Sequence, residues 1–157
     1  MEVHRAARDE LLAAHGARIA TWKVAYRGLV PDSYLDELVL TPERLAAIHE
    51  RHDAGTTRTW VATVDGEVVG MAVSGGCRDE DRVGEQELWA LYVLPAQWGS
   101  GAGQLLWDAA LPFTSLWVLE DNARARAFYE RNGFRPDGSS MPVAFTDGVT
   151  EVRYVLG

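Results

Sequence analysis

The chain has a single cysteine and no long apolar run, and each shortage excludes a class of protein. Cys77 alone cannot form an internal disulfide, and it stands at no metal-ligand spacing. No apolar stretch approaches the roughly 20 residues that a membrane-spanning helix requires. Residues 1–16 mix acids, bases and histidines before any apolar stretch, so we expect no signal peptide and a cytoplasmic location.

Basic residues are also scarce. The 15 Lys and Arg stand against 23 Asp and Glu, which gives a net charge of −8. Nucleic acids and anionic membranes are bound by a basic face that displaces counterions, so neither partner is expected. A negative surface suits cationic acceptors such as amines. His49 and His52 lack acidic or cysteine partners at ligand spacing, so they are interpreted as helix histidines and no metal site is expected.

Length and composition predict one domain over 1–157. A chain of 157 residues with 47% apolar side chains can bury a sizeable core. Two domains of ordinary size would need a longer chain. The sequence contains no repeat, no low-complexity tract and no linker long enough to separate domains.

Periodicity and turn signals predict the elements of the first half. From Leu11 to Tyr26, large side chains recur at spacings of four, four, three and four, which is one helical face. Thr41 followed by Pro42 is typical of a helix start. Asp65-Gly66 between two β-branched segments is a hairpin signal. The expected elements are a strand over 3–6, helices over 11–26, 31–38 and from 42 onward, and strands over 59–64 and 67–74.

The second half predicts a mixed sheet. The near-continuous apolar run over 87–94 is typical of a central strand covered on both faces. A helix connects it to the next strand, which implies a parallel pair, with helices on both faces of the sheet. A polar, acidic loop over 75–84 precedes this region. The expected elements are strands over 87–94 and 115–119, helices over 102–110 and 122–132, and closing strands over 134–136 and 149–156.

A glycine-rich segment over 93–103 lies between the predicted central strand and the following helix. Its three glycines let the backbone approach a ligand, and the positive end of the helix favours a pyrophosphate. A plain tight turn is the alternative. A P-loop requires Gly-Lys-Ser/Thr, and Gln104 after Gly103 excludes it. A dinucleotide-binding fold is disfavoured because too little sequence follows for its remaining strands.

Two motifs resemble the GNAT superfamily of acetyl-CoA-dependent N-acetyltransferases. That family has a Gln/Arg-x-x-Gly-x-Gly/Ala loop before one helix and an Asn-x-Arg-Ala-x-x-Phe-Tyr helix that ends at Gly-Phe. Residues 98–103 match the loop except at Trp98, where Gln or Arg is usual, and residues 122–129 match the second motif fully. The resemblance covers nearly the whole chain. It implies an α/β fold with a mixed, mostly antiparallel central sheet, helices on both faces and a splayed parallel strand pair.

The resemblance implies acetyl-CoA as the co-substrate, with its pantetheine arm between the splayed strands. Main-chain groups at the end of the first strand would bind the arm, and loop amides would hold the pyrophosphate. Asn122 would contact the arm from the second strand. Arg124 or Arg126 would lie near the phosphates, unless both belong to a solvated helix face. The implied cofactor-binding residues are Leu91, Tyr92 and Val93, then Trp98, Gly99, Ser100, Gly101, Ala102 and Gly103, and finally Asn122, Arg124 and Tyr129.

Acetyl transfer to an alkyl amine needs a base and an acid. An ammonium group with a pKa of about 10 has no lone pair until a base or a water relay removes a proton. Glu87 matches a position where the family often places this carboxylate, and its alternative is a strand-end acid facing water. Strand alternation would put Glu85, the reserve candidate, on one side with Glu87, Trp89 and Leu91. By the same resemblance Tyr129 protonates the departing thiolate; its alternative is a core aromatic.

The sequence therefore predicts an N-acetyltransferase that moves an acetyl group from acetyl-CoA directly to a primary amine in a ternary complex. The acceptor is a small molecule or a peptide, and naming it further would be analogy alone. Trp22 and Tyr26 lie where this fold shapes its acceptor pocket, and also on the helix face expected to pack the core. A non-catalytic acyl-CoA-binding or sensing module is the alternative function, and another acyl group is a third. Homodimers are common in the family, although no stretch here indicates one.

Overall fold

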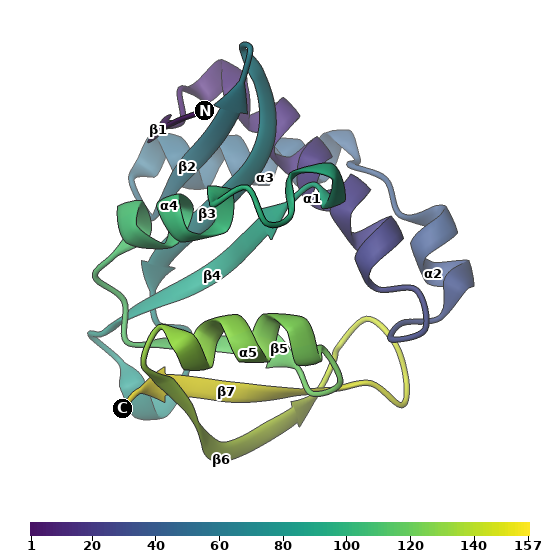
Figure 1. Ribbon diagram of the computed structural model, residues 1–157, viewed down its shortest axis with the longest axis vertical. Coiled ribbons are helices and arrows are strands. Elements are labelled where there is room, and N and C mark those ends of the chain that lie inside the picture. Colours follow the sequence, from purple (N-terminus) through teal and green to yellow (C-terminus); the bar gives the residue numbers. More distant parts are fainter.

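A seven-stranded sheet in the order β1-β2-β3-β4-β5-β7-β6 forms the centre of the computed structural model, which describes residues 1–157 (Figure 1). All neighbouring strands are antiparallel except β4 and β5. The predicted mixed, mostly antiparallel sheet with one parallel pair is therefore confirmed. The strands are β1 (Glu2–Arg5), β2 (Thr57–Val64), β3 (Glu67–Gly76), β4 (Gln86–Val93), β5 (Ser115–Leu119), β6 (Phe134–Pro142) and β7 (Thr150–Leu156).

Helices cover both faces of the sheet, as predicted. The first and third helices bury Leu11 and Ile48 against Met71 on one face. The last two helices pack Leu106 and Phe128 against the other face, which is turned toward the viewer in Figure 1. None of the helices combines the length and the apolarity that crossing a bilayer requires. The helices are α1 (Leu11–Ala25), α2 (Asp32–Glu37), α3 (Pro42–Ala54), α4 (Ala102–Ala110) and α5 (Ala123–Arg131).

Local chemistry explains why several of these elements begin and end where they do. The Thr41 hydroxyl accepts a hydrogen bond from the Arg44 amide at 3.2 Å, and this cap begins α3. Asp65 and Gly66 both have positive φ, 51° and 82°, as a two-residue turn between β2 and β3 requires. β6 is longer than predicted because it pairs with β7 beyond an irregularity between Pro136 and Ser140. Its residues are mostly exposed, so they carry no apolar alternation.

The parallel strands β4 and β5 separate soon after they meet. They pair only at Glu87–Ser115 and Leu88–Leu116. Figure 1 shows β4 rising away from β5 toward the right of the view. The two halves of the sheet therefore enclose a wedge-shaped gap, and the main-chain groups that border it have no strand partner.

A bulge in β4 corrects one prediction about this strand. Val73 lies opposite Ala90 and Ser74 opposite Leu88, so Trp89 is the extra residue. An extra residue shifts all later side chains to the other face. Trp89 packs with the cluster under α1 and α3, whereas Leu91 packs with the cluster under α4 and α5. The expectation that Leu91 shares a side with Trp89 is therefore wrong.

Candidate active site

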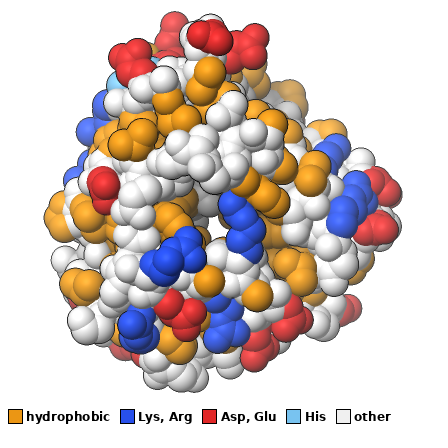
Figure 2. Space-filling view, viewed as in Figure 1, with side chains coloured by type: hydrophobic (Ala, Val, Ile, Leu, Met, Phe, Trp, Pro, Cys, Tyr) orange, Lys and Arg blue, Asp and Glu red, His pale blue; other side chains and the backbone are white.

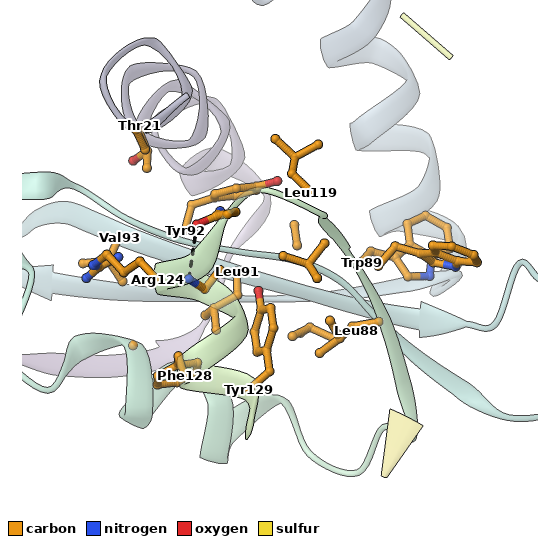
Figure 3. Close-up of a pocket in the computed structure, with 18 of the residues that line it drawn as sticks. Thr21, Leu88, Trp89, Leu91, Tyr92, Val93, Leu119, Arg124, Phe128 and Tyr129 are labelled. Carbon is orange, nitrogen blue, oxygen red and sulfur yellow. Dashed lines mark hydrogen bonds between the residues drawn. The ribbon is translucent and has the colours of Figure 1, made fainter. Parts of the chain in front are cut away.

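A cavity of about 1160 Å³ lies in the gap between β4 and β5. Because only the first residues of these strands pair, the gap is open along the rest of their length. The lining comes from both faces of the sheet: one end of α1, nearly all of β4 and β5, the glycine-rich loop, and α5. Figure 3 shows Leu91 and Tyr92 of β4 on one side of this space, with Phe128 and Tyr129 of α5 on the other.

The main chain of β4 presents hydrogen-bonding groups to the cavity. The Leu94 amide donates to the Val69 carbonyl at 2.8 Å. Because ladder bonds alternate along an antiparallel strand, Tyr92 bonds toward β3, while Leu91 and Val93 direct their main-chain groups into the gap. The Val93 carbonyl accepts a hydrogen bond from Trp98 Nε1 at 2.8 Å. The amides of Leu91 and Val93 thus face the cavity, whereas Tyr92 lines it with its side chain.

The glycine-rich loop turns into α4 at the edge of the cavity. Gly99 and Gly101 have φ of 80° and 92°, a region that other residues rarely adopt. These two glycines and Gly103 line the cavity, whereas Ser100 and Ala102 do not. The first amides of α4 have no carbonyl partner within the helix. Together with the positive end of the helix dipole, they form a site suited to a phosphate group.

Arginines lie beside this loop, although only one of the two predicted candidates faces the cavity. The Arg124 guanidinium lies 3.7 Å from the Trp98 ring centroid and so bridges the loop and α5. Burial lowers the pKa of Arg124. Arg131 also lines the cavity. Arg126 instead donates to the Tyr154 hydroxyl and the Glu120 carbonyl, each at 2.7 Å, and is absent from the lining.

Basic side chains lie at the edge of a central hollow on the face that carries α4 and α5 (Figure 2). Asn122 lines the cavity at the start of α5. Its Oδ1 atom accepts a hydrogen bond from the Ala125 amide at 3.2 Å, so it also caps that helix. The part of the cavity beside the glycine loop and α5, which we call the anion-binding or first mouth, therefore offers amides, a helix start and arginines. All of these groups bind anions.

Tyr129 belongs both to the core and to the cavity. Its side chain is only 8% exposed and its ring lies 5.7 Å from the Trp107 ring. The hydroxyl points into the space between Leu91 and Leu88 (Figure 3) and makes no hydrogen bond within the chain. Burial raises the pKa of Tyr129, so the phenol stays protonated at neutral pH.

Glu87 lies at the narrow end of the gap, where β4 and β5 still pair. It is 1% exposed and lines the cavity. Its carboxylate accepts hydrogen bonds from the Arg78 amide at 3.0 Å and from Arg78 Nη2 at 2.6 Å. Glu85 precedes β4, bonds Thr114 Oγ1 at 2.8 Å and Arg82 at 2.9 Å, and does not line the cavity. The structure thus brings Glu87, and not Glu85, to the site.

The part of the cavity on the α1 side of the sheet, which we call the second mouth, has an aromatic wall. Trp22 and Tyr26 of α1 both line it, with ring centroids 4.9 Å apart. Burial raises the pKa of Tyr26. Phe145, between β6 and β7, completes the wall at 5.5 Å from Trp22 and stacks on Tyr34 at 4.7 Å. Trp22 and Tyr26 thus both pack in the core and border the cavity, while their contact with an acceptor stays a prediction.

Several lining residues were not identified from the sequence. The acidic loop that precedes β4 supplies Arg78 and Asp79, and β7 supplies Glu151. The composition of this loop indicates only that it is polar and acidic, and not which of its residues turns inward. Phe145 follows a strand that has no periodic signal. Only the three-dimensional convergence of these segments makes them visible.

Comparisons with known proteins agree with this geometry. A family model described as "Acetyltransferase (GNAT) domain" matches residues 55–136. "Probable N-acetyltransferase Rv2775" of Mycobacterium tuberculosis is 30% identical over 130 residues, 76% of this chain and 71% of that protein. The PaiA N-acetyltransferase of Thermoplasma acidophilum, solved with coenzyme A, superposes with a TM-score of 0.77 at 19% identity, covering 99% of this chain and 98% of that one. YncA of Salmonella typhimurium, solved with acetyl-CoA, gives 0.69 at 22%, covering 99% and 94%.

Proposed function

The chain belongs to the GNAT family of acetyltransferases, and we propose that it transfers the acetyl group of acetyl-CoA to a primary amine. One observation carries the proposal: a single cavity between β4 and β5 is lined by the glycine loop and arginines in one part and by carboxylates in another. Such a cavity can hold an anionic acyl donor and a cationic acceptor at the same time. This arrangement supports direct transfer in a ternary complex, in which proximity of donor and acceptor makes a covalent enzyme intermediate unnecessary.

The residues around the first mouth fit acetyl-CoA. The amides of Leu91 and Val93 match the amide-rich pantetheine arm, which would extend β4 like an added strand. The Gly99–Gly103 loop and the start of α4 match the pyrophosphate, and Arg124 supplies positive charge beside it. Asn122 borders the arm from the side of β5. These contacts support acetyl-CoA, as the co-substrate, in this part of the cavity.

Two side chains carry the proton transfers in this proposal. Glu87, directly or through a water molecule, takes a proton from the acceptor ammonium, which frees the lone pair for attack on the thioester carbon. The Val93 amide donates to the carbonyl oxygen as its negative charge grows. A C–N bond forms and the C–S bond breaks; Tyr129 donates its proton to the departing thiolate and takes up the proton that the nitrogen of the tetrahedral intermediate loses, so a neutral amide and a free thiol leave and the phenol is restored. Arg78 pairs with Glu87 and is half exposed, so in this proposal the acceptor or the water molecule must reach the carboxylate beside Arg78.

Calorimetric titration with acetyl-CoA, free CoA and NAD tests the cofactor site first. We expect micromolar binding of both CoA species and no binding of NAD. Release of free CoA thiol, measured with a panel of small amines and peptides, then tests turnover. Absence of CoA binding would mean that the glycine loop is only a turn, and the enzyme proposal would be withdrawn.

A non-catalytic acyl-CoA-binding module is the second candidate, because Arg78 already occupies the Glu87 carboxylate. A module of this kind binds CoA with similar affinity but releases no thiol with any amine. Competition between acyl-CoAs of different chain length, followed by the same titration, tests whether a group other than acetyl fits. The two experiments therefore separate an acetyltransferase from a sensor and from a different acyltransferase.

A further inference from the structure

Glu151 differs from the other carboxylates that line the cavity. Asp79 accepts a hydrogen bond from Trp117 Nε1 at 2.9 Å and pairs with Arg153 at 3.3 Å. Glu87 is bound by Arg78, as described above. Glu151 lines the same cavity and is half-buried, yet its carboxylate makes no hydrogen bond or ion pair within residues 1–157. It is the one cavity carboxylate that is free to bind a ligand.

The position of Glu151 in β7 directs it away from the cofactor mouth. It lies opposite Leu119 of β5, next to Val152, which packs with the cluster under α4 and α5. Because side chains alternate along a strand, Glu151 projects to the other face. Leu119 packs there with Tyr26, one of the aromatic residues of the second mouth. Glu151 and the aromatic wall thus border the same end of the cavity.

The surroundings of Glu151 are fixed by a neighbouring ion-pair cluster. Arg153, two residues along β7 on the same face, bonds Asp81 at 2.8 Å and Asp137 at 2.7 Å as well as Asp79. These contacts tie the acidic loop before β4 to β7. Glu151 therefore lies in a strand that ion pairs tie to the acidic loop before β4 and to β6.

An unpaired carboxylate in this position is costly unless something binds it. Burial raises the pKa of Glu151 above its ordinary value. Arg78 opposes that shift, while Glu87 and Asp79 add to it. Partial removal of a charge from water without a partner disfavours the charged form, so a cation that reaches this carboxylate is expected to bind it. Arg78, the cation whose charge acts on Glu151, already binds Glu87.

We propose that Glu151 binds the ammonium group of the acceptor, and that the acceptor is a primary amine carried on an aromatic or other apolar group. Trp22, Tyr26 and Phe145 provide the surface for that group. The ammonium group held by Glu151 lies in the same cavity as Glu87, which receives the proton. This inference rests on the proposed function, but it assigns a binding role to Glu151 and leaves the proton transfers to Glu87 and Tyr129.

The test uses phenethylamine and its neutral analogue 2-phenylethanol as probes. Calorimetry measures the binding of each to the full chain, free and saturated with CoA, for the wild type, Glu151→Gln and Glu120→Gln. Glu120 is an exposed acid outside the cavity, so its variant removes the same charge without touching the site. We expect the wild type and Glu120→Gln to bind phenethylamine at least about 10-fold more tightly than 2-phenylethanol, which corresponds to about 1.4 kcal/mol. Glu151→Gln binds both probes alike.

Turnover supplies a second measurement. If Glu151 only binds the ammonium group, Glu151→Gln raises KM for phenethylamine about 10-fold and changes kcat by less than about 3-fold. A wild type without ammonium preference, or a Glu151→Gln variant that keeps it, overturns the inference. Failure of the proposed function gives a different result: CoA does not bind, or no thiol is released. In that case the free wild type still prefers the ammonium probe, and Glu151→Gln still lacks this preference.

Discussion

The two mouths of the cavity are built by different means. The anion-binding mouth comes largely from backbone groups in two continuous segments, the end of β4 with its glycine loop and the start of α5. The second mouth, where we propose that the acceptor binds (the acceptor mouth), comes from side chains far apart in the chain, Trp22, Arg78, Phe145 and Glu151. Backbone amides are present in every sequence, so a few glycines and a helix start suffice to aim them. A side-chain site requires that distant segments converge.

The two mouths also differ in charge. Arg124 and Arg131 line the part beside the glycine loop and α5, whereas the other charged lining residues are three acids, Asp79, Glu87 and Glu151, and one base, Arg78. A cavity with opposite charges at its ends orders its ligands, because a phosphate-bearing donor and an ammonium acceptor are each attracted to one end. The net charge of −8 alone describes neither end. Mutations that act at one mouth and spare the other test this division.

Tyr129→Phe acts where the two mouths meet, and we expect the largest effect there. The variant keeps the ring that packs on Trp107 and loses only the hydroxyl that faces the cavity. Turnover should fall about 100- to 1000-fold because the thiolate leaves without a proton donor. Acetyl-CoA affinity, measured by calorimetry, should change little. Unchanged turnover would remove Tyr129 from the mechanism.

Low pH should destabilise the protein through His15 of α1, the helix that also supplies Trp22 and Tyr26 to the aromatic wall of the acceptor mouth. Burial, with smaller effects of Arg18 and Arg51, lowers the pKa of His15 from 6.5 to about 4. The unfolded chain then binds a proton more readily than the folded one, so stability is lost as pH falls from about 6.5 toward about 4. The free energy of unfolding should fall by about 3 kcal/mol from this group. Denaturant titrations at pH 7 and pH 4 measure the loss.

His15→Asn is the matched control for the acid effect. The asparagine Oδ1 atom can accept the hydrogen bond that Arg18 Nε donates to His15 Nδ1 at 3.2 Å, but it does not titrate. The variant should lose less stability than the wild type between the two pH values. Asparagine and histidine have similar helix propensities, and any packing cost of the substitution applies at both pH values, so the difference isolates His15. An identical pH dependence in both proteins would contradict the assignment.

The fold was largely predictable because its signals are local. The Asp65-Gly66 turn and the α3 cap follow from two residues each, and the second GNAT motif marks α5. The bulge at Trp89 carries no such signal, since neither a glycine nor a break in apolar pattern accompanies it. Its effect is large, because it reverses the face of Leu91. The residues of the acceptor mouth were equally unpredictable from the sequence. Glu151 resembles any acid in a strand near the edge of the sheet, and only the structure shows that Arg78 binds Glu87 and leaves Glu151 unpaired.

Gly101→Val should disable the anion-binding mouth alone. At a φ of 92° a β-branched side chain strains the backbone, although nothing lies near its Cβ position. The loop must change shape, and we expect CoA affinity to fall about 100-fold, while the ammonium preference of the free protein persists. Gly138→Val is the control, because Gly138 has a φ of 90° with equal space and lies outside the cavity. Equal losses of CoA affinity in both would indicate general destabilisation.

Trp98→Ala and Phe145→Ala form a crossed pair at the two mouths, with the smallest expected effects. Trp98 is 37% exposed, holds the Val93 carbonyl and stacks on Arg124, so its loss should weaken CoA binding about 10-fold. Phe145, 38% exposed beside Trp22, should instead weaken phenethylamine binding by a similar factor, through lost ring contact. Calorimetry with both ligands on both variants gives four affinities. If each variant weakens only the ligand of its own mouth, the mouths are separate; if both variants weaken both ligands, the gap between β4 and β5 behaves as one flexible site and the division by charge fails.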